Sequence, residues 1–113
     1  MRSLSIQVQP TRSPGIDMEH VTRAFQALAD RQDLVQHHAF SHGEDKGPYF
    51  NYTFGTPYAA ELWDRIRAVV YDHADLGSHM RRASMAMCSS ESGWDDYVLL
   101  HHFDPAVATS DIE

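Results

Sequence analysis

The chain has 113 residues, of which 42% are hydrophobic, with five Phe, five Tyr and two Trp. This composition predicts one folded domain with its own core and excludes a wholly disordered chain. The net charge of −7 disfavours direct binding to nucleic acid, whose phosphates it would repel. No apolar run reaches the roughly 20 residues that cross a bilayer, so no membrane partner is expected. The lone Cys88 cannot form an internal disulfide, and we expect a cytoplasmic protein.

The first elements are a strand and a helix. Residues 4–9 alternate apolar and polar side chains, which predicts a strand, and the Pro- and Gly-containing segment 10–15 predicts a loop. Asp17 is a favourable N-cap for a helix that we expect to end near Arg31. Its apolar positions recur at helical spacing, which predicts one buried face made of Met18, Val21, Phe25 and Leu28.

The middle of the chain predicts a β-hairpin. Residues 34–42 alternate in polarity, and 49–54 are rich in aromatic residues and Thr, so both segments favour strands. The six residues 43–48 between them include two glycines and a proline and predict the connection.

A second helix and a second hairpin complete the chain. Thr56 and Pro57 form a favourable helix start, and an apolar stripe continues toward Gly77, which we expect to end that helix. Strands are then predicted over 83–88 and 96–103, with a turn over 89–95 between them.

The resulting order, β-α-β-β-α-β-β, predicts an α+β fold of the ferredoxin-like kind. In this fold an antiparallel sheet carries two helices on one face, and here an extra C-terminal strand is added. We expect a single domain over residues 1–105 and a flexible tail over 106–113.

Histidine is unusually frequent, with eight residues. His38 and His42 lie on one face of the strand 34–42, and together with His101 they are the only candidates for a zinc site. However, the two strands that carry them are expected at opposite edges of a ferredoxin-like sheet. Solvent-facing or hydrogen-bonded histidines are therefore the preferred interpretation, and no metal is predicted.

No local motif predicts an enzyme. Cys88 lies at the end of a strand and is followed by acidic Glu91, which favours a packed thiol over a nucleophile. The glycines of 43–47 lack the spacing of a nucleotide-binding loop. We therefore assign no catalytic residue and no cofactor from the sequence.

The last quarter of the chain is the most acidic. After Arg82 there are six acidic residues and no Lys or Arg. Trp and Tyr beside carboxylates are typical of surfaces that bind Arg and Lys on a partner protein. The predicted partner-binding residues are Glu91, Trp94, Asp95, Asp96, Tyr97 and Asp104. Trp94 is predicted either to be exposed at this surface or to fold back onto the sheet.

The segment from Gly93 to Pro105 resembles segments of small acidic immunity proteins of bacterial toxin systems. The resemblance implies a non-enzymatic, cytoplasmic inhibitor that masks a basic partner such as a cognate toxin. In that case acidic side chains would accelerate the encounter electrostatically. An acidic inhibitor that mimics DNA is a variant of the same hypothesis.

The alternative comes from the fold. Ferredoxin-like chains of this length pair their sheets into dimeric α+β barrels that enclose a small-molecule pocket. On that hypothesis the protein is a cofactor-free oxygenase or isomerase, and Tyr49, His38, Asn51 or His101 would line its cavity. A monomer fits the inhibitor, whereas a homodimer with an internal pocket fits the enzyme.

Overall fold

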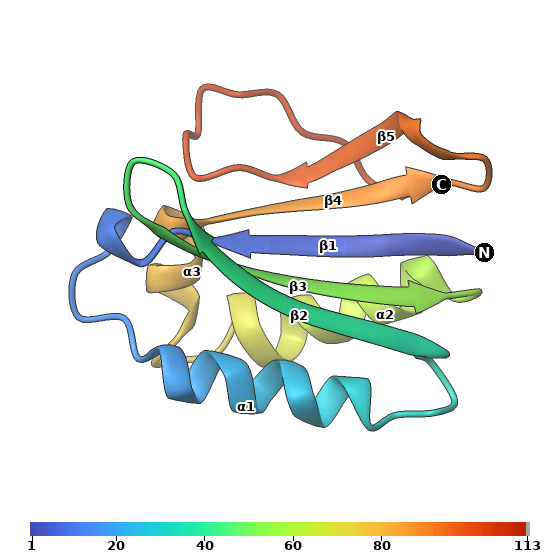
Figure 1. The fold of residues 1–113 in the computed structure, drawn as a ribbon, viewed down its shortest axis with the longest axis horizontal. Helices are drawn as coiled ribbons and strands as arrows, with labels where there is room; N and C mark the ends of the chain where they lie inside the picture. The colour runs from blue at the N-terminus through green and yellow to red at the C-terminus, as the bar shows by residue number, and fades with distance from the viewer. Residues whose placement is uncertain (113) are drawn as a thin grey trace.

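A computed structural model of the chain describes residues 1–112 (Figure 1). The strands are β1 Arg2–Val8, β2 His37–Glu44, β3 Pro48–Thr56, β4 Ser84–Ser90 and β5 Gly93–His101. The α-helices are α1 Met18–Ala29, α2 Ala59–Ile66 and α3 Gly77–Ala83. A 3-10 turn, Pro10–Arg12, follows β1, and a π-helical turn, Arg67–Tyr71, extends α2.

The five strands form one antiparallel sheet in the order β2-β3-β1-β4-β5. The first four strands have the order of a ferredoxin-like sheet, and β5 is added beside β4, which confirms the predicted fold class. The helices lie on one side of the sheet in Figure 1. Among residues 1–112 no α-helix lies on the other face.

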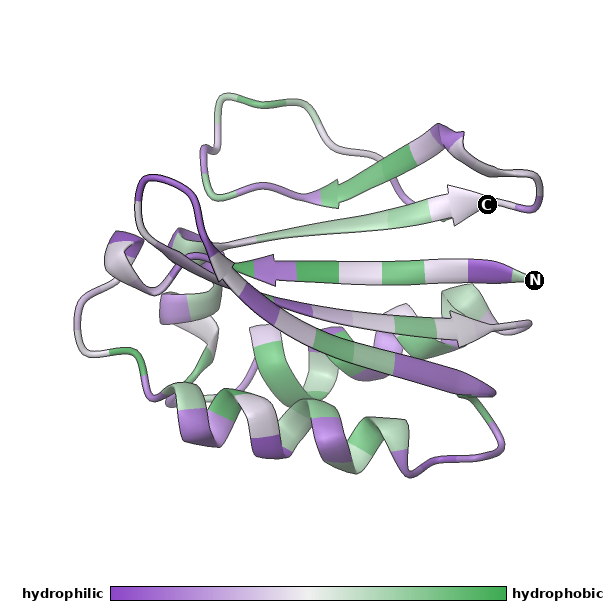
Figure 2. Cartoon of the chain, viewed as in Figure 1, coloured by the Kyte–Doolittle hydropathy of each residue, from purple (hydrophilic) through white to green (hydrophobic). Residues whose placement is uncertain are grey.

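Alternation along the strands separates the two faces. In β1 the side chains of Leu4, Ile6 and Val8 are fully buried toward the helices, and Figure 2 shows their alternation with more polar residues. On the same side, the Phe25 ring of α1 stacks on Tyr52 of β3 at 4.4 Å between ring centroids. The hydrophobic core therefore lies between the sheet and the helices.

The predicted start of the first helix is confirmed, because the Asp17 carboxylate accepts a 3.1 Å hydrogen bond from the His20 N–H. The predicted single helix from Thr56 to Gly77 is wrong. The chain leaves α2 through the π-helical turn, and Gly77 begins α3. A Cβ atom at residue 77 would overlap the Tyr71 carbonyl, so this close approach of two backbones requires glycine.

Thr56 is not the N-cap of the second helix, as the sequence predicted, but lies before it. Its hydroxyl accepts a 2.9 Å hydrogen bond from the Tyr58 N–H and donates a 2.5 Å bond to the Leu34 carbonyl. The N-cap of α2 is therefore Tyr58. Thr56 instead ties the start of this helix to the segment that precedes β2.

The strand boundaries differ from those predicted by a few residues. Residues 34 and 35 form a turn after α1, in which the Val35 N–H donates to the Arg31 carbonyl at 2.8 Å. The apolar Val35 fits the alternation of the predicted strand, but it is buried, at 4% exposure, as part of this turn and not of the strand. At the other hairpin, β5 begins three residues earlier than expected, at Gly93, where φ is +129°.

The chain after β5 turns back along that strand. The Ser110 N–H donates a 2.8 Å hydrogen bond to the Leu99 carbonyl, and Ile112 packs against the core. The flexibility expected of 106–113 stays a prediction. Within the described residues no helix is long and apolar enough to cross a membrane.

Candidate functional site on the open face of the sheet

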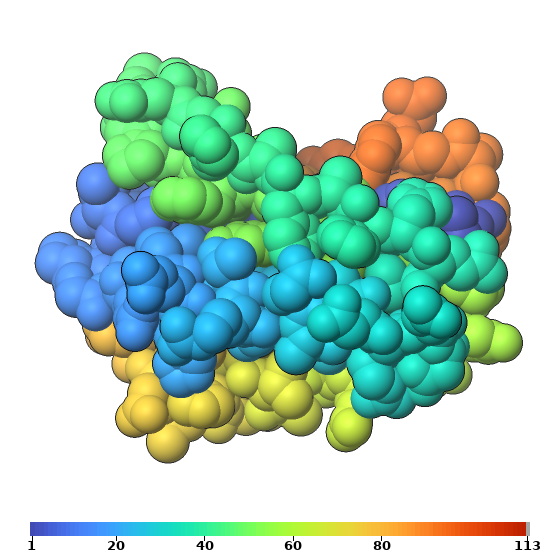
Figure 3. All heavy atoms as spheres, turned by 60° about the horizontal axis from the view of Figure 1, so that its bottom comes forward, coloured from blue at the N-terminus to red at the C-terminus, as the bar shows by residue number. Residues whose placement is uncertain are grey.

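The face of the sheet without helices is polar at its centre. Ser5 and Gln7 of β1 lie directly beside Thr53 and Asn51 of β3 in the antiparallel register. The Ser5 and Thr53 hydroxyls are 3.2 Å apart and share a hydrogen bond. At one end of this face the β2–β3 hairpin projects outward, as Figure 3 shows in green. Polar strands below and a projecting hairpin at the end create a recess.

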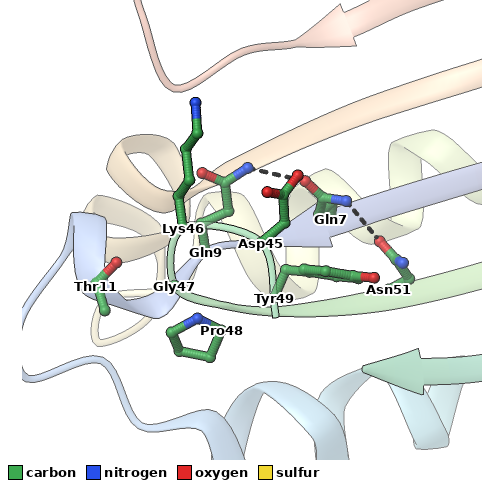
Figure 4. Close-up of a pocket in the computed structure, with 9 residues that line it drawn as sticks. All are labelled: Gln7, Gln9, Thr11, Asp45, Lys46, Gly47, Pro48, Tyr49 and Asn51. Atoms are coloured by element: carbon green, nitrogen blue, oxygen red, sulfur yellow. Dashed lines mark hydrogen bonds between the residues drawn. The ribbon is translucent and has the colours of Figure 1, made fainter. Parts of the chain in front are cut away.

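A hollow of about 290 Å³ lies at the base of the hairpin. Three elements contribute to it: the end of β1 and the turn that follows it, the hairpin loop, and the start of β3 (Figure 4). The residues that line it are Gln7, Gln9, Thr11, Asp45, Lys46, Gly47, Pro48, Tyr49 and Asn51. Most of these side chains carry hydrogen-bonding groups, so the hollow suits a small polar ligand.

A chain of hydrogen bonds joins the amide side chains in the hollow. The Gln9 amide donates to the Gln7 side-chain carbonyl at 2.9 Å, and the Gln7 amide donates to the Asn51 side-chain carbonyl at 3.1 Å. Figure 4 shows both bonds, with Lys46 pointing away from the amides. Beyond Gln9, the Arg12 guanidinium donates to the Gln9 carbonyl at 2.6 Å.

Arg12 sets the direction of this chain. A guanidinium can only donate hydrogen bonds, so Gln9 must present its carbonyl oxygen to Arg12 and its NH₂ group to Gln7. Because the Gln7 side-chain carbonyl accepts from Gln9, Gln7 must donate its NH₂ group to the Asn51 side-chain carbonyl. The NH₂ group of Asn51 is then the last donor of the chain. Within residues 1–112 no ion pair joins Arg12 to a carboxylate. Successive donors polarise one another, so the cation strengthens Asn51 as a donor.

The hairpin turn supplies a carboxylate and a phenol at the rim. The Asp45 N–H donates to the Gly47 carbonyl at 3.0 Å, across a turn in which Lys46 and Gly47 have φ of +59° and +132°. Tyr49 pairs across the hairpin with Gly43, and its ring covers that glycine so closely that a Cβ atom there would overlap the hydroxyl. The glycine thus gives the Tyr49 ring its place in the hollow.

The structure places five of the six predicted partner-binding residues on the β4–β5 hairpin, which projects in orange in Figure 3. Trp94 and Tyr97 are exposed, at 44% and 53%. Glu91 is already paired, because its carboxylate lies 2.7 Å from the Met1 amino group and 3.9 Å from Arg2. This contact lowers the pKa of Glu91 through a hydrogen bond and charge attraction. Asp104 lies apart, beyond the other end of β5.

Asp95 and Asp96 lie on strand β5 itself and not in a turn, and both are exposed. Successive side chains of a strand point to opposite faces, so these two carboxylates diverge. Of the four predicted carboxylates, Glu91 is paired with the Met1 amino group and Asp104 lies away from the hairpin. Asp95 and Asp96 remain on the hairpin with Trp94 and Tyr97, and their partner-binding role stays a prediction.

The histidine candidates are separated by the sheet. His38 and His42 lie on β2 and His101 on β5, which are its opposite edges. Among residues 1–112 no group of three or more His, Cys, Asp or Glu side chains could hold a metal ion. Cys88 is buried in the core, and burial raises the pKa of its thiol.

The cavity residues predicted for the enzyme alternative divide into two pairs. Tyr49 and Asn51 line the hollow together. His38 lies on the helix-covered side, with its ring 5.2 Å from that of Phe40, and His101 contacts Tyr71 at 4.8 Å. The sequence analysis did not identify Gln7, Gln9 and Arg12 as site residues. The alternation of β1 already placed Gln7 and Gln9 on the face of the sheet opposite to its apolar residues. The pairing of β1 with β3, which brings Asn51 beside Gln7, could not be predicted from the sequence.

No model of a known protein family matches the chain, and no curated protein matches it. Among solved structures, a phage SAM lyase in complex with S-methyl-5'-thioadenosine matches with a TM-score of 0.48 and 14% sequence identity. The match covers 89% of each chain. At this score the likeness carries no argument about the ligand or reaction of the present chain.

The prediction of a non-enzymatic immunity-type inhibitor is corrected. The solved structure named above is that of an enzyme and not of an immunity protein, and no family model or curated protein supports the prediction. Of the four carboxylates on which the prediction depended, Glu91 is paired with the Met1 amino group and Asp104 lies beyond the other end of β5. The resemblance of residues 93–105 to immunity proteins is itself tested by no comparison.

Proposed function

We propose that the protein is an enzyme that transfers a proton on a small polar molecule, with its active site in the hollow beneath the β2–β3 hairpin. The observation that supports the proposal most directly is the hydrogen-bond chain that begins at Arg12 and ends at the NH₂ group of Asn51. Its donors are fixed in direction before any ligand arrives. Preorganised donors of this kind stabilise charge that develops on an oxygen during a reaction.

The proposed chemistry uses three groups of the hollow. The Asn51 amide donates to a carbonyl oxygen of the substrate. The Asp45 carboxylate removes a proton from the adjacent carbon, and the electron pair of that C–H bond moves toward the carbonyl oxygen. Where a carbon–carbon double bond adjoins the deprotonated carbon, Asp45 returns the proton to the far carbon of that double bond, the electron pair leaves the oxygen as the carbonyl reforms, and the double bond is shifted by one position. Tyr49 donates a hydrogen bond to the oxygen while it carries charge.

We further propose that the active form is a homodimer in which a second copy covers the open face. Met85 and Met87 of β4 lie beside Gln7 and Ser5 on that face, and Leu99 pairs with Met87. These apolar side chains are only partly buried in one copy. A second sheet would bury them and exclude water from the hollow, which strengthens its electrostatic interactions.

We also propose that the protein is located in the cytoplasm. The buried Cys88, which forms no disulfide, supports this location.

The test is a search for turnover. The purified protein is incubated with an ultrafiltered small-molecule extract, and mass spectrometry with heavy water in the solvent identifies compounds that are isomerised or that gain deuterium. We expect Asp45→Asn to lower kcat by about a hundredfold or more, because it removes the proposed base. Asn51→Ala is expected to lower kcat/KM by about tenfold to a hundredfold through the lost donor.

Matched controls lie outside the open face. Asp96→Asn on β5 and Tyr58→Phe at the start of α2 make the same chemical changes as Asp45→Asn and Tyr49→Phe on exposed residues. They should leave turnover unchanged. The proposal is overturned if no compound exchanges or isomerises, or if Asp45→Asn and Asp96→Asn have equal effects. Sedimentation tests the dimer separately. A monomer with full turnover would contradict the proposed homodimer but not the proposed active site.

A further inference from the structure

A second cavity of about 410 Å³ lies between the end of α3 and the chain that follows β5. One side is formed by Arg81 and Arg82, at the last turn of α3. The other side is formed by the end of β5 and its following loop. Its full lining is Arg81, Arg82, His101, His102, Phe103, Asp104, Pro105, Val107 and Thr109. The cavity is distinct from the hollow on the open face, with which it shares no lining residue.

The charges around this cavity are opposite in sign to the net charge of the chain. Of its lining residues, two are arginines, two are histidines and only Asp104 is acidic. Arg12 adds a third guanidinium, because its Cζ atom lies 3.6 Å from the centroid of the Phe103 ring. In a protein with a net charge of −7, this cluster forms a local region of positive potential.

Arg82 is held in place by neutral groups. Its Nε and Nη2 atoms lie 3.3 and 3.1 Å from the hydroxyl of Ser13, a residue with 1% exposure. Within residues 1–112 no carboxylate forms an ion pair with Arg82. Arg81 is paired with exposed Asp72 at 3.1 Å. Arg82 therefore presents an oriented cation whose charge is uncompensated.

The loop side of the cavity is shaped by its own hydrogen bonds and contributes apolar side chains. The Asp104 carboxylate accepts a 3.0 Å bond from the Ala106 N–H, and the Asp104 carbonyl accepts a 3.1 Å bond from the Val107 N–H. These bonds shape the loop so that its apolar side chains, Phe103, Pro105 and Val107, form a wall of the cavity. Within residues 1–112 the Asp104 carboxylate forms no ion pair with Arg82.

The pKa of His101 depends on the charges around the cavity. Its Nε2 atom donates a 3.1 Å hydrogen bond to the Arg81 carbonyl, and burial, His102 and the Arg81 charge lower its pKa. The other titratable or charged groups near it are Tyr71, Arg67, Asp72 and Asp111. An anion bound beside His101 would favour its protonated form.

We propose that this cavity binds a small molecule that carries an oxyanion, a phosphate or a carboxylate, on an apolar body. The oxyanion lies against Arg82 and Arg81, and the apolar body lies against Phe103, Pro105 and Val107. Guanidinium groups bind phosphate and carboxylate through paired N–H donors, and aromatic rings bind apolar bodies by contact. The proposal is independent of the reaction assigned to the hollow.

Calorimetric titration with phenyl phosphate tests the proposal, with benzoate, inorganic phosphate and benzyl alcohol as comparison ligands. Phenyl phosphate or benzoate should bind at least about tenfold more tightly than either inorganic phosphate or benzyl alcohol, because only the first two satisfy both sides of the cavity. The ratio of the first two affinities distinguishes a phosphate from a carboxylate ligand. Equal binding of inorganic phosphate overturns the apolar subsite.

Variants locate the binding. Arg82→Gln keeps a donor for Ser13 but removes the charge, and it should weaken phenyl phosphate binding by about fivefold to tenfold. Arg65→Gln, the same change on α2 and outside the cavity, should leave binding unchanged. Phe103→Ala provides a second variant, independent of the α3 contacts. NMR titration should show that phenyl phosphate raises the pKa of His101. If Arg82→Gln, Phe103→Ala and Arg65→Gln all bind like the unaltered protein, the assignment is wrong.

Discussion

The two faces of the sheet show how one set of strands serves two purposes. On the covered face, β1 contributes Leu4, Ile6 and Val8 to a core closed by the helices. On the open face, the same strand contributes Ser5 and Gln7 to side-chain hydrogen bonds with β3. Stability and ligand recognition can therefore be altered separately, because adjacent residues of a strand point to opposite sides of the sheet.

The largest effect should come from the covered face. Phe25 is fully buried and stacks on Tyr52, so Phe25→Ala should lower the free energy of unfolding by about 3–5 kcal/mol. Tyr97→Ala, at an exposed position on β5, should change it by about 0.5 kcal/mol or less. Urea unfolding followed by circular dichroism measures both. Similar losses for the two variants would contradict the assigned core.

A smaller loss is expected when a single buried hydrogen bond is removed. The Tyr71 hydroxyl donates to Ser84 Oγ at 2.6 Å, and Ser84 donates onward to the Met80 carbonyl at 2.6 Å. Tyr71→Phe should lower the free energy of unfolding by about 1 kcal/mol, because it removes one bond in a dry site. The same change at exposed Tyr58 should have no measurable effect. A loss at Tyr71 no greater than at Tyr58 would show that this bond adds nothing to stability.

The open face should respond in function and not in stability. Gly43→Ala would push the Tyr49 ring out of the hollow, because the new Cβ atom overlaps its hydroxyl. Turnover should fall severalfold, while the free energy of unfolding changes by less than about 1 kcal/mol. Gly55→Ala is the matched control at the far end of the same ladder, where the overlapping ring is His37. Equal turnover in the two variants would contradict the role given to Tyr49.

The smallest expected effect is a pH dependence of stability from His101. Burial and neighbouring positive charge lower its pKa in the folded state, so the unfolded chain binds this proton more readily. Stability is therefore retained above the ordinary His pKa of about 6.5 and declines as pH falls below it. Comparison of the unfolding free energies of the unaltered protein and His101→Gln between neutral and mildly acidic pH isolates this term. An identical decline in both would exclude His101 as its source.

Much of the fold could be predicted because its signals are local. Alternation in residues 4–9 and the Asp17 cap depend on neighbours in sequence, and both match the structure. The break in the second helix could not be predicted, since it depends on a close contact between Gly77 and the Tyr71 carbonyl. A helical stripe in the sequence shows which side is buried but not where the chain bends.

The candidate site depends on partners that are distant in sequence. Asn51 and Tyr49 were expected to line a cavity in the enzyme alternative, and both do. Gln7 gains its role only because β1 pairs with β3, which brings Asn51 within hydrogen-bond distance. Arg12 gains its role through the turn that follows β1. The acidic C-terminal residues could be selected from the sequence because charge is visible in composition, whereas an ordered chain of neutral amides is not.

The most direct test of the active-site assignment uses the side-chain amides themselves. The chain has five Gln and one Asn, and three of these six residues, Gln7, Gln9 and Asn51, line the hollow. In the ¹⁵N-labelled protein, addition of the compound identified by turnover should shift the side-chain NH₂ signals of these three. The signals of Gln26, Gln32 and Gln36 should stay in place. Shifts confined to the second set, or no shift in either, would contradict the assignment of the hollow as the active site.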